Sequence, residues 1–144
     1  MIDRKGKWRI NTMIKGFATH VKGFASSYSN TGDIILIGKS MKEMMHAFKE
    51  LKQMNGGIVL VEDGQVVVKI PLTLGGSVYD GDVNALIPLE VELKEALKQR
   101  GYHHSDAIYT LLFLQSTHLP YVRITQRGIF DVMKKQVLFP TVMR

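Results

Sequence analysis

The chain has 144 residues, a formal net charge of +6 and no cysteine. This length fits one domain that buries a core without covalent staples, and the lack of cysteine excludes disulfides, thiolate nucleophiles and zinc–sulfur sites. No stretch approaches the roughly eighteen apolar residues of a membrane span, so we expect a cytoplasmic protein that does not contact membranes. The basic residues gather near the two ends without regularly spaced aromatic residues, which disfavours nucleic acid as a partner.

The first predicted element is a helix over residues 11–23. Asn11 can cap it and Gly23 can end it. Residues 24–27 then read as a short extended piece. The apolar face of the predicted helix consists of Ile14, Phe17, Ala18 and Val21.

A polar loop over residues 28–33 separates this extended piece from the next strand. Its sequence is Tyr-Ser-Asn-Thr-Gly-Asp. Hydroxyl and amide side chains both donate and accept hydrogen bonds, so such a loop can hold a ligand. It can equally be a turn, and the residues alone leave both interpretations open.

A β-α-β unit is the clearest pattern in the chain. The apolar run 34–37 predicts a strand, and Ser40 with Glu43 forms a capping box that starts a helix ending near residue 54. Residues 58–72 hold two β-branched runs about an Asp-Gly pair, which predicts a β-hairpin. The sequence therefore predicts the α/β class, with a mixed sheet, a β-α-β unit, a hairpin at 58–72 and helices packed on the sheet.

The rest of the chain carries weaker signals. Residues 74–82 are glycine-rich but lack the spacing of a phosphate-binding loop. Pro88 predicts the first turn of a helix that ends at Gly101. The apolar block 107–114 fits a helix or a strand, whereas 122–125 and 129–132 predict strands on either side of a turn. Without repeats or linkers, residues 1–144 are expected to form a single domain.

Spacing alone identifies no catalytic or metal-binding residue. None of the five histidines forms a His-x-His or His-x-x-x-His pair. His103 and His104 are adjacent but lack a third ligand, and Asp80 with Asp82 supplies too few oxygens for calcium. We therefore assign no catalytic residue and no metal ligand to this chain.

The order of several short motifs nevertheless resembles the C-terminal domain of bacterial adenine deaminases, and especially the divergent adenine-deaminase-like branch found in bacilli. The likeness extends over nearly the whole chain. The motifs that carry it are Lys15-Gly16-Phe17, Gly23-Phe24-Ala25-Ser26-Ser27, Asp33-Ile34-Ile35-Leu36-Ile37-Gly38, Gly56-Gly57-Ile58-Val59-Leu60-Val61-Glu62-Asp63-Gly64, Ile70-Pro71-Leu72, Thr110-Leu111-Leu112-Phe113-Leu114 and Ile124-Thr125-Gln126-Arg127-Gly128-Ile129-Phe130-Asp131-Val132.

This resemblance implies a metal-dependent amidohydrolase of purine catabolism. In such enzymes an upstream barrel domain holds a divalent metal, manganese or iron, and the metal-bound hydroxide displaces ammonia from adenine to leave hypoxanthine. The present chain would then be the C-terminal domain of a longer enzyme and inactive alone. Its implied partners are the upstream barrel domain and a small-molecule purine, with a homo-oligomer as a further option.

The polar loop departs from the family pattern. Typical members have two histidines, an aspartate and an asparagine after the Ala-Ser-Ser motif, and residues 28–33 lack both histidines. If the loop approaches the pocket of the barrel, Ser26, Ser27 and Asn30 are the residues expected near the substrate, and the substrate itself can differ from adenine. The alternative is a non-catalytic nucleobase- or nucleic-acid-binding module.

Overall fold

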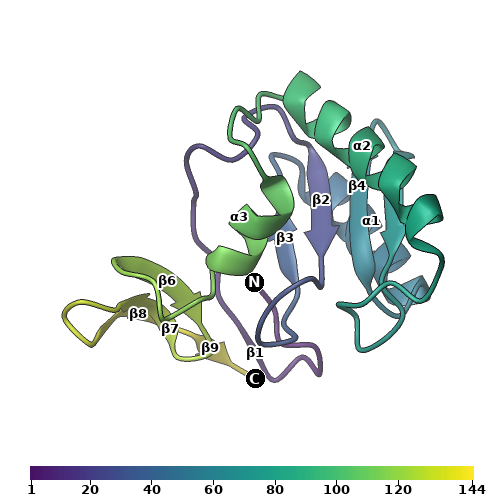
Figure 1. Ribbon diagram of the computed structural model, residues 1–144. Coiled ribbons are helices and arrows are strands. Elements are labelled where there is room, and N and C mark those ends of the chain that lie inside the picture. Colours follow the sequence, from purple (N-terminus) through teal and green to yellow (C-terminus); the bar gives the residue numbers. More distant parts are fainter.

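A computed structural model describes all residues, 1–144, with three helices and nine strands (Figure 1). The main sheet has four antiparallel strands in the order β3-β2-β4-β5, and a second sheet has the order β6-β7-β8. The strands are β1 (Trp8–Arg9), β2 (Gly23–Ser26), β3 (Ile35–Ile37), β4 (Gly57–Glu62), β5 (Gln65–Pro71), β6 (Val122–Thr125), β7 (Gly128–Asp131), β8 (Gln136–Pro140) and β9 (Val142–Met143). The helices are α1 (Met41–Gln53), α2 (Val83–Gln99) and α3 (Ala107–Phe113).

The predicted α/β class and the β-α-β unit are confirmed. Strands β3 and β4 are joined by α1, and both pair antiparallel with β2, so they run parallel to each other with β2 between them. Every hydrogen-bonded strand pair in the main sheet is therefore antiparallel, although β3 and β4, which are not neighbours, run in the same direction. The hairpin is also confirmed, because β4 pairs with β5 across Asp63 and Gly64, which both have positive φ.

Helix α1 starts at the predicted cap but completes it differently. Ser40 Oγ accepts the backbone amide of Glu43 at 3.3 Å. The Glu43 carboxylate does not return to the cap, because it accepts the amide of Gly64 at the hairpin turn at 3.2 Å. A Cβ atom on Gly23 would lie 2.3 Å from the backbone of Glu43, so glycine allows β2 to lie directly against the start of the helix.

The two faces of the main sheet bury two separate parts of the core. Helix α1 covers one face through Ala47 and Leu51, which pack on Ala25 and Val59. Helices α2 and α3 cover the other face (Figure 1). The larger cluster on that face includes Phe24, Ile58, Leu60, Ile70, Leu93, Leu97 and Leu111.

Two sequence predictions about helices are wrong. Residues 11–22 form an irregular segment rather than a helix, with Gly16 at a φ of +92°. Phe17 anchors this segment by packing its ring against Phe24 and Tyr102, with ring centroids 5.8 and 5.4 Å away. Helix α2 begins at Val83 instead of Pro88, because the side chain of Asp82 caps it by accepting the amide of Asn84 at 2.9 Å.

The C-terminal third of the chain resolves the remaining ambiguity. The apolar block folds as α3, capped by Asp106. The two predicted strands become β6 and β7, and β8 completes a small sheet that packs on Trp8 and Ile10 through Ile129. None of the three helices is both long and apolar enough to span a membrane.

Candidate functional site

The polar loop lies at one end of the main sheet, where it leaves β2 and returns to β3. The structure places the three predicted substrate-proximal residues in different surroundings. Ser26 is fully buried and its hydroxyl accepts the amide of Tyr28 at 3.1 Å. Ser27 is 2% exposed, whereas Asn30 is exposed. Only Asn30 of the three therefore presents its side chain to solvent.

The hydroxyl of Ser27 connects three backbone segments. It accepts the amide of Gly57 at 2.8 Å and donates to the carbonyl of Gly76. A Cβ atom on Gly56 would lie 2.5 Å from Gly76 Cα, so the glycine-rich segment 74–82 can come this close only beside a glycine. The Arg4 guanidinium fixes the same segment by donating to the carbonyl of Gly75. Ser27 thus holds the base of the polar loop in place.

The tip of the loop forms hydrogen bonds with the two residues that follow the C-cap of α3. Asn30 Nδ2 donates to Ser116 Oγ at 2.6 Å, and Thr31 Oγ1 lies 3.0 Å from Gln115 Oε1. Gln115 and Ser116 are both 3% exposed. Segments separated by more than eighty residues therefore meet in a compact polar cluster, made of the loop and these two side chains.

Two groups in this cluster are costly to bury. Burial raises the pKa of Asp33 above its ordinary value of 3.8, and the hydrogen bond from Thr31 opposes this shift. Ser29 Oγ is buried and makes no hydrogen bond. A buried hydroxyl without a partner costs free energy, so Ser29 is a position where an additional polar group would be stabilising.

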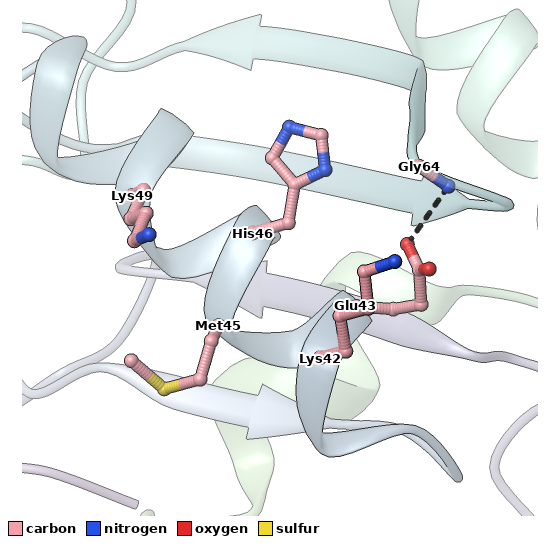
Figure 2. A pocket seen from close by; sticks show the side chains of 6 residues that line it. All are labelled: Lys42, Glu43, Met45, His46, Lys49 and Gly64. Atoms are coloured by element: carbon pink, nitrogen blue, oxygen red, sulfur yellow. Dashed lines mark hydrogen bonds between the residues drawn. The ribbon is translucent and has the colours of Figure 1, made fainter.

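A second candidate is a shallow pocket on α1 (Figure 2). Lys42, His46 and Lys49 follow one another along successive turns of the helix, and Glu43 lies beside them with its carboxylate turned to Gly64. The nearest carboxylate to His46 is that of Glu50, at 4.0 Å, and this group already binds Lys69 at 2.9 Å. Positive charge here can attract an anion, but the pocket contains no free carboxylate to pair with the histidine as a catalytic dyad.

A long apolar groove is the third candidate. It runs along the edge strand β3, between the N-terminal segment 1–21 and α1. Met13 and Met41 line it and are 96% and 71% exposed. Lys15, Lys39 and Lys52 also line it. Exposed apolar side chains with basic neighbours are typical of a surface that packs against another protein segment.

The histidine and aspartate pairs do not form metal sites. His104 Nε2 lies 3.1 Å from the carbonyl of Gly16, and His103 is exposed. Asp82 caps α2, whereas Asp80 is exposed. No group of three or more histidine, aspartate or glutamate side chains is arranged to hold a metal ion. The residues of this chain therefore do not fit the divalent metal that the resemblance implies for the longer enzyme.

Sequence reasoning located the polar loop but missed its partners. Gln115 and Ser116 follow an apolar block whose helix or strand character was undecided, so their position in space was not predictable. The groove was missed because its N-terminal wall was expected to be a helix. One signal was present in the sequence, because Met13 is apolar and has no place on the predicted apolar face; the structure shows it 96% exposed.

Comparisons with known proteins agree on one family. The family described as "Adenine deaminase C-terminal domain" matches residues 1–136. "Putative adenine deaminase YerA" of Bacillus subtilis is 57% identical over all 144 residues, and "Putative adenine deaminase BH0637" of Halalkalibacterium halodurans is 56% identical. An "Adenine deaminase" of Geobacillus kaustophilus is 30% identical over 124 residues, which are 85% of this chain.

The extent of these matches also places the chain within its relatives. It spans about a quarter of the length of the curated relatives that it matches, with 25% of each of the first two covered. The resemblance found in the sequence motifs is confirmed, and these comparisons give no support to the alternative of a non-catalytic nucleobase- or nucleic-acid-binding module. The chain belongs to the family of adenine deaminase C-terminal domains.

Proposed function

We propose that this chain is the non-catalytic C-terminal domain of a metal-dependent hydrolase that converts adenine into hypoxanthine and ammonia. The observation that carries this proposal is that the entire chain matches about a quarter of the length of two relatives named "Putative adenine deaminase". In the longer protein a divalent metal, manganese or iron, would supply the hydroxide nucleophile from an upstream barrel domain. Residues of this chain would bind and position rather than react.

The apolar groove is the surface that we assign to the upstream domain. Met1 lines the groove, so the chain that precedes this domain in its relatives would enter beside it. Met13, Met41 and Met45 would become buried on docking, which is favourable by about 25 cal/mol for each Å² of apolar surface removed from water. Methionine suits such a contact because its flexible side chain adapts to irregular surfaces.

The polar loop is the part of this chain that we place nearest to the substrate. Ser26 and Ser27 are buried and would position the loop from behind, whereas Asn30 is exposed and could contact the purine or the barrel loops that surround it. The unpaired hydroxyl of Ser29 could gain its missing partner there. Because the loop lacks the histidines of typical members, the substrate could be an amino-purine other than adenine.

Ammonia release tests the proposal. The longer protein that contains this chain and the 144-residue chain alone are incubated with manganese or iron and with a panel of amino-purines. We expect release by the longer protein only. Turnover by the 144-residue chain alone would contradict the proposal, and so would a longer protein that is inactive toward every member of the panel.

A substitution in the longer protein then tests the role of the loop. Asn30→Ala should raise KM with little change in kcat if Asn30 contacts the substrate. Ser77→Ala is the matched control, because Ser77 is a half-buried serine of the neighbouring glycine-rich segment. An unchanged KM for Asn30→Ala would remove Asn30 from the substrate site.

A further inference from the structure

Asp33 places a carboxyl group inside the polar cluster at the end of the main sheet. The residue is 3% exposed, and Thr31 Oγ1 lies within hydrogen-bond distance of it, 2.5 Å from Oδ2. An ionised carboxylate at such a position loses its hydration, whereas the neutral acid keeps an O–H group that can donate. The protonation state of Asp33 therefore decides in which direction the hydrogen bond with Thr31 runs.

The hydroxyl of Thr31 lies between two acceptors. Besides Asp33 Oδ2, it contacts Oε1 of the buried Gln115 at 3.0 Å. Met1 orients the Gln115 amide, because a thioether sulfur accepts but does not donate, so Nε2 faces Met1 Sδ and Oε1 faces Thr31. One hydroxyl has one proton to donate, so an ionised Asp33 and Gln115 cannot both receive it. One of the two contacts would then join two oxygens with no proton between them.

We propose that Asp33 holds the tip of the polar loop as a neutral carboxylic acid. Its proton is donated to Thr31 Oγ1, which leaves the Thr31 proton for Gln115 Oε1. Every contact in this series then has one donor and one acceptor. When the proton of Asp33 passes to water, Thr31 turns its own proton to the carboxylate, and Gln115 loses its donor.

The second contact between the loop and the residues after α3 does not depend on this proton. Asn30 Nδ2 donates to Ser116 Oγ at 2.6 Å, and Ser116 Oγ donates to the carbonyl of Leu112 at 3.0 Å. None of these groups titrates near neutral pH. Ionisation of Asp33 therefore leaves the loop attached through Asn30 alone, so the polar loop has a tighter acid form and a looser ionised form.

The surroundings of Asp33 favour the neutral acid. Burial is the largest effect and raises the pKa of Asp33 above its ordinary value of 3.8, and the nearby carboxylate of Asp3 raises it further. The hydrogen bond from Thr31 and the amino group of Met1 oppose this rise. Where further chain precedes Met1, as in the longer relatives, that nitrogen is an uncharged amide. The pKa of Asp33 should then lie higher than in the 144-residue chain.

NMR titration of the side-chain carboxyl groups of the 144-residue chain tests the proposal. The Asp33 signal is the one that disappears in Asp33→Asn, and its pKa should lie above the ordinary value. Gln115→Met removes the competing acceptor, so Thr31 becomes free to donate to the carboxylate and the pKa of Asp33 should fall. Burial alone predicts no fall, because methionine is less polar than glutamine. Ser116→Ala, equally buried, is the matched control and should leave this pKa unchanged.

Variants of Thr31 show whether the effect of Gln115 passes through its hydroxyl. In Thr31→Val the hydroxyl is absent, so adding Gln115→Met should no longer lower the pKa of Asp33. Thr31→Ser keeps a hydroxyl and should keep the response. In the original chain, the backbone amide signal of Gly32 should shift with pH at the midpoint of Asp33. This shift should be lost in Asp33→Asn, because the asparagine amide donates to Thr31 at every pH.

Three results would overturn the proposal. The first is an Asp33 carboxyl that titrates at or below its ordinary value, and the second is a Gln115→Met variant in which the pKa of Asp33 stays or rises. The third is a Gly32 amide signal that does not follow the titration of Asp33. The first and third are measured on the original chain, so they decide the matter even if Gln115→Met does not fold. None requires substrate or metal, so they are separate from the test of ammonia release.

Discussion

Ser27 was predicted to lie near the substrate, and in the structure its hydroxyl forms hydrogen bonds that hold the backbone in place. Its hydroxyl uses both its accepting and its donating capacity on the backbone of Gly57 and Gly76. Ser27→Ala should therefore lower the free energy of unfolding by about 1–3 kcal/mol, because it leaves a buried amide and a buried carbonyl without this partner. Urea denaturation measures the change. Ser77→Ala should stay within about 0.5 kcal/mol of the original chain, and equal effects of the two variants would contradict the structural role.

Asp33 makes a second prediction at this scale, because burial raises its pKa in the folded chain above the ordinary value of 3.8. A carboxylate that holds its proton more tightly when folded makes the folded state less stable as the pH rises through its folded pKa. Asp33→Asn should therefore raise the melting temperature at pH 7, and this gain should vanish as the pH falls below about 3.8. Thermal unfolding across pH checks it. Glu92→Gln, at an exposed position, should show no such trend.

Helix α2 contains a residue that is unfavourable inside a helix, because Pro88 is its sixth residue. Proline removes one backbone hydrogen bond and crowds the preceding turn. Pro88 is exposed, so Pro88→Ala sacrifices no packing. We expect a gain of about 1–2 kcal/mol, which is less than the roughly 3 kcal/mol difference in helix propensity because proline also restricts the unfolded chain. Thermal unfolding measures it against Glu92→Ala, and a loss of stability would show that the helix requires the proline.

Short sequence motifs correctly predicted the helix and the hairpin that depend only on neighbouring residues. Ser40 and the Asp63-Gly64 turn act on neighbouring residues, so α1 and the hairpin were found from the sequence. The apolar pattern of residues 11–22 predicted a helix that does not form. Phe17 packs instead on Tyr102, a residue 85 positions away, and this contact outweighs a short helix. The partners of the polar loop were unpredictable for the same reason, since Ser116 and Gln115 reach it only through the tertiary fold.

At the scale of the whole molecule, the small sheet of β6, β7 and β8 shares no strand pairing with the main sheet. Its link to the remainder of the chain is a cluster in which Ile129 packs on Trp8 and Ile10. A backbone hydrogen bond from Ile124 to Leu114 adds a second connection. The small sheet is therefore joined to the N-terminal segment by this cluster and by the pairing of β1 with β9, and its stability should be separable there from that of the main sheet.

Trp8 is the single tryptophan of the chain and is 6% exposed within this contact, so its fluorescence reports on it. Ile129→Ala should destabilise the contact by about 2–5 kcal/mol, which is the cost of removing buried methyl groups. We expect the fluorescence transition in urea to move to a lower concentration than the far-UV circular dichroism transition, because α1 and α2 belong to the main sheet's core. Leu138→Ala, at an exposed position of β8, should move neither. Equal shifts of both transitions would instead mean that the contact couples the two sheets into one cooperative unit.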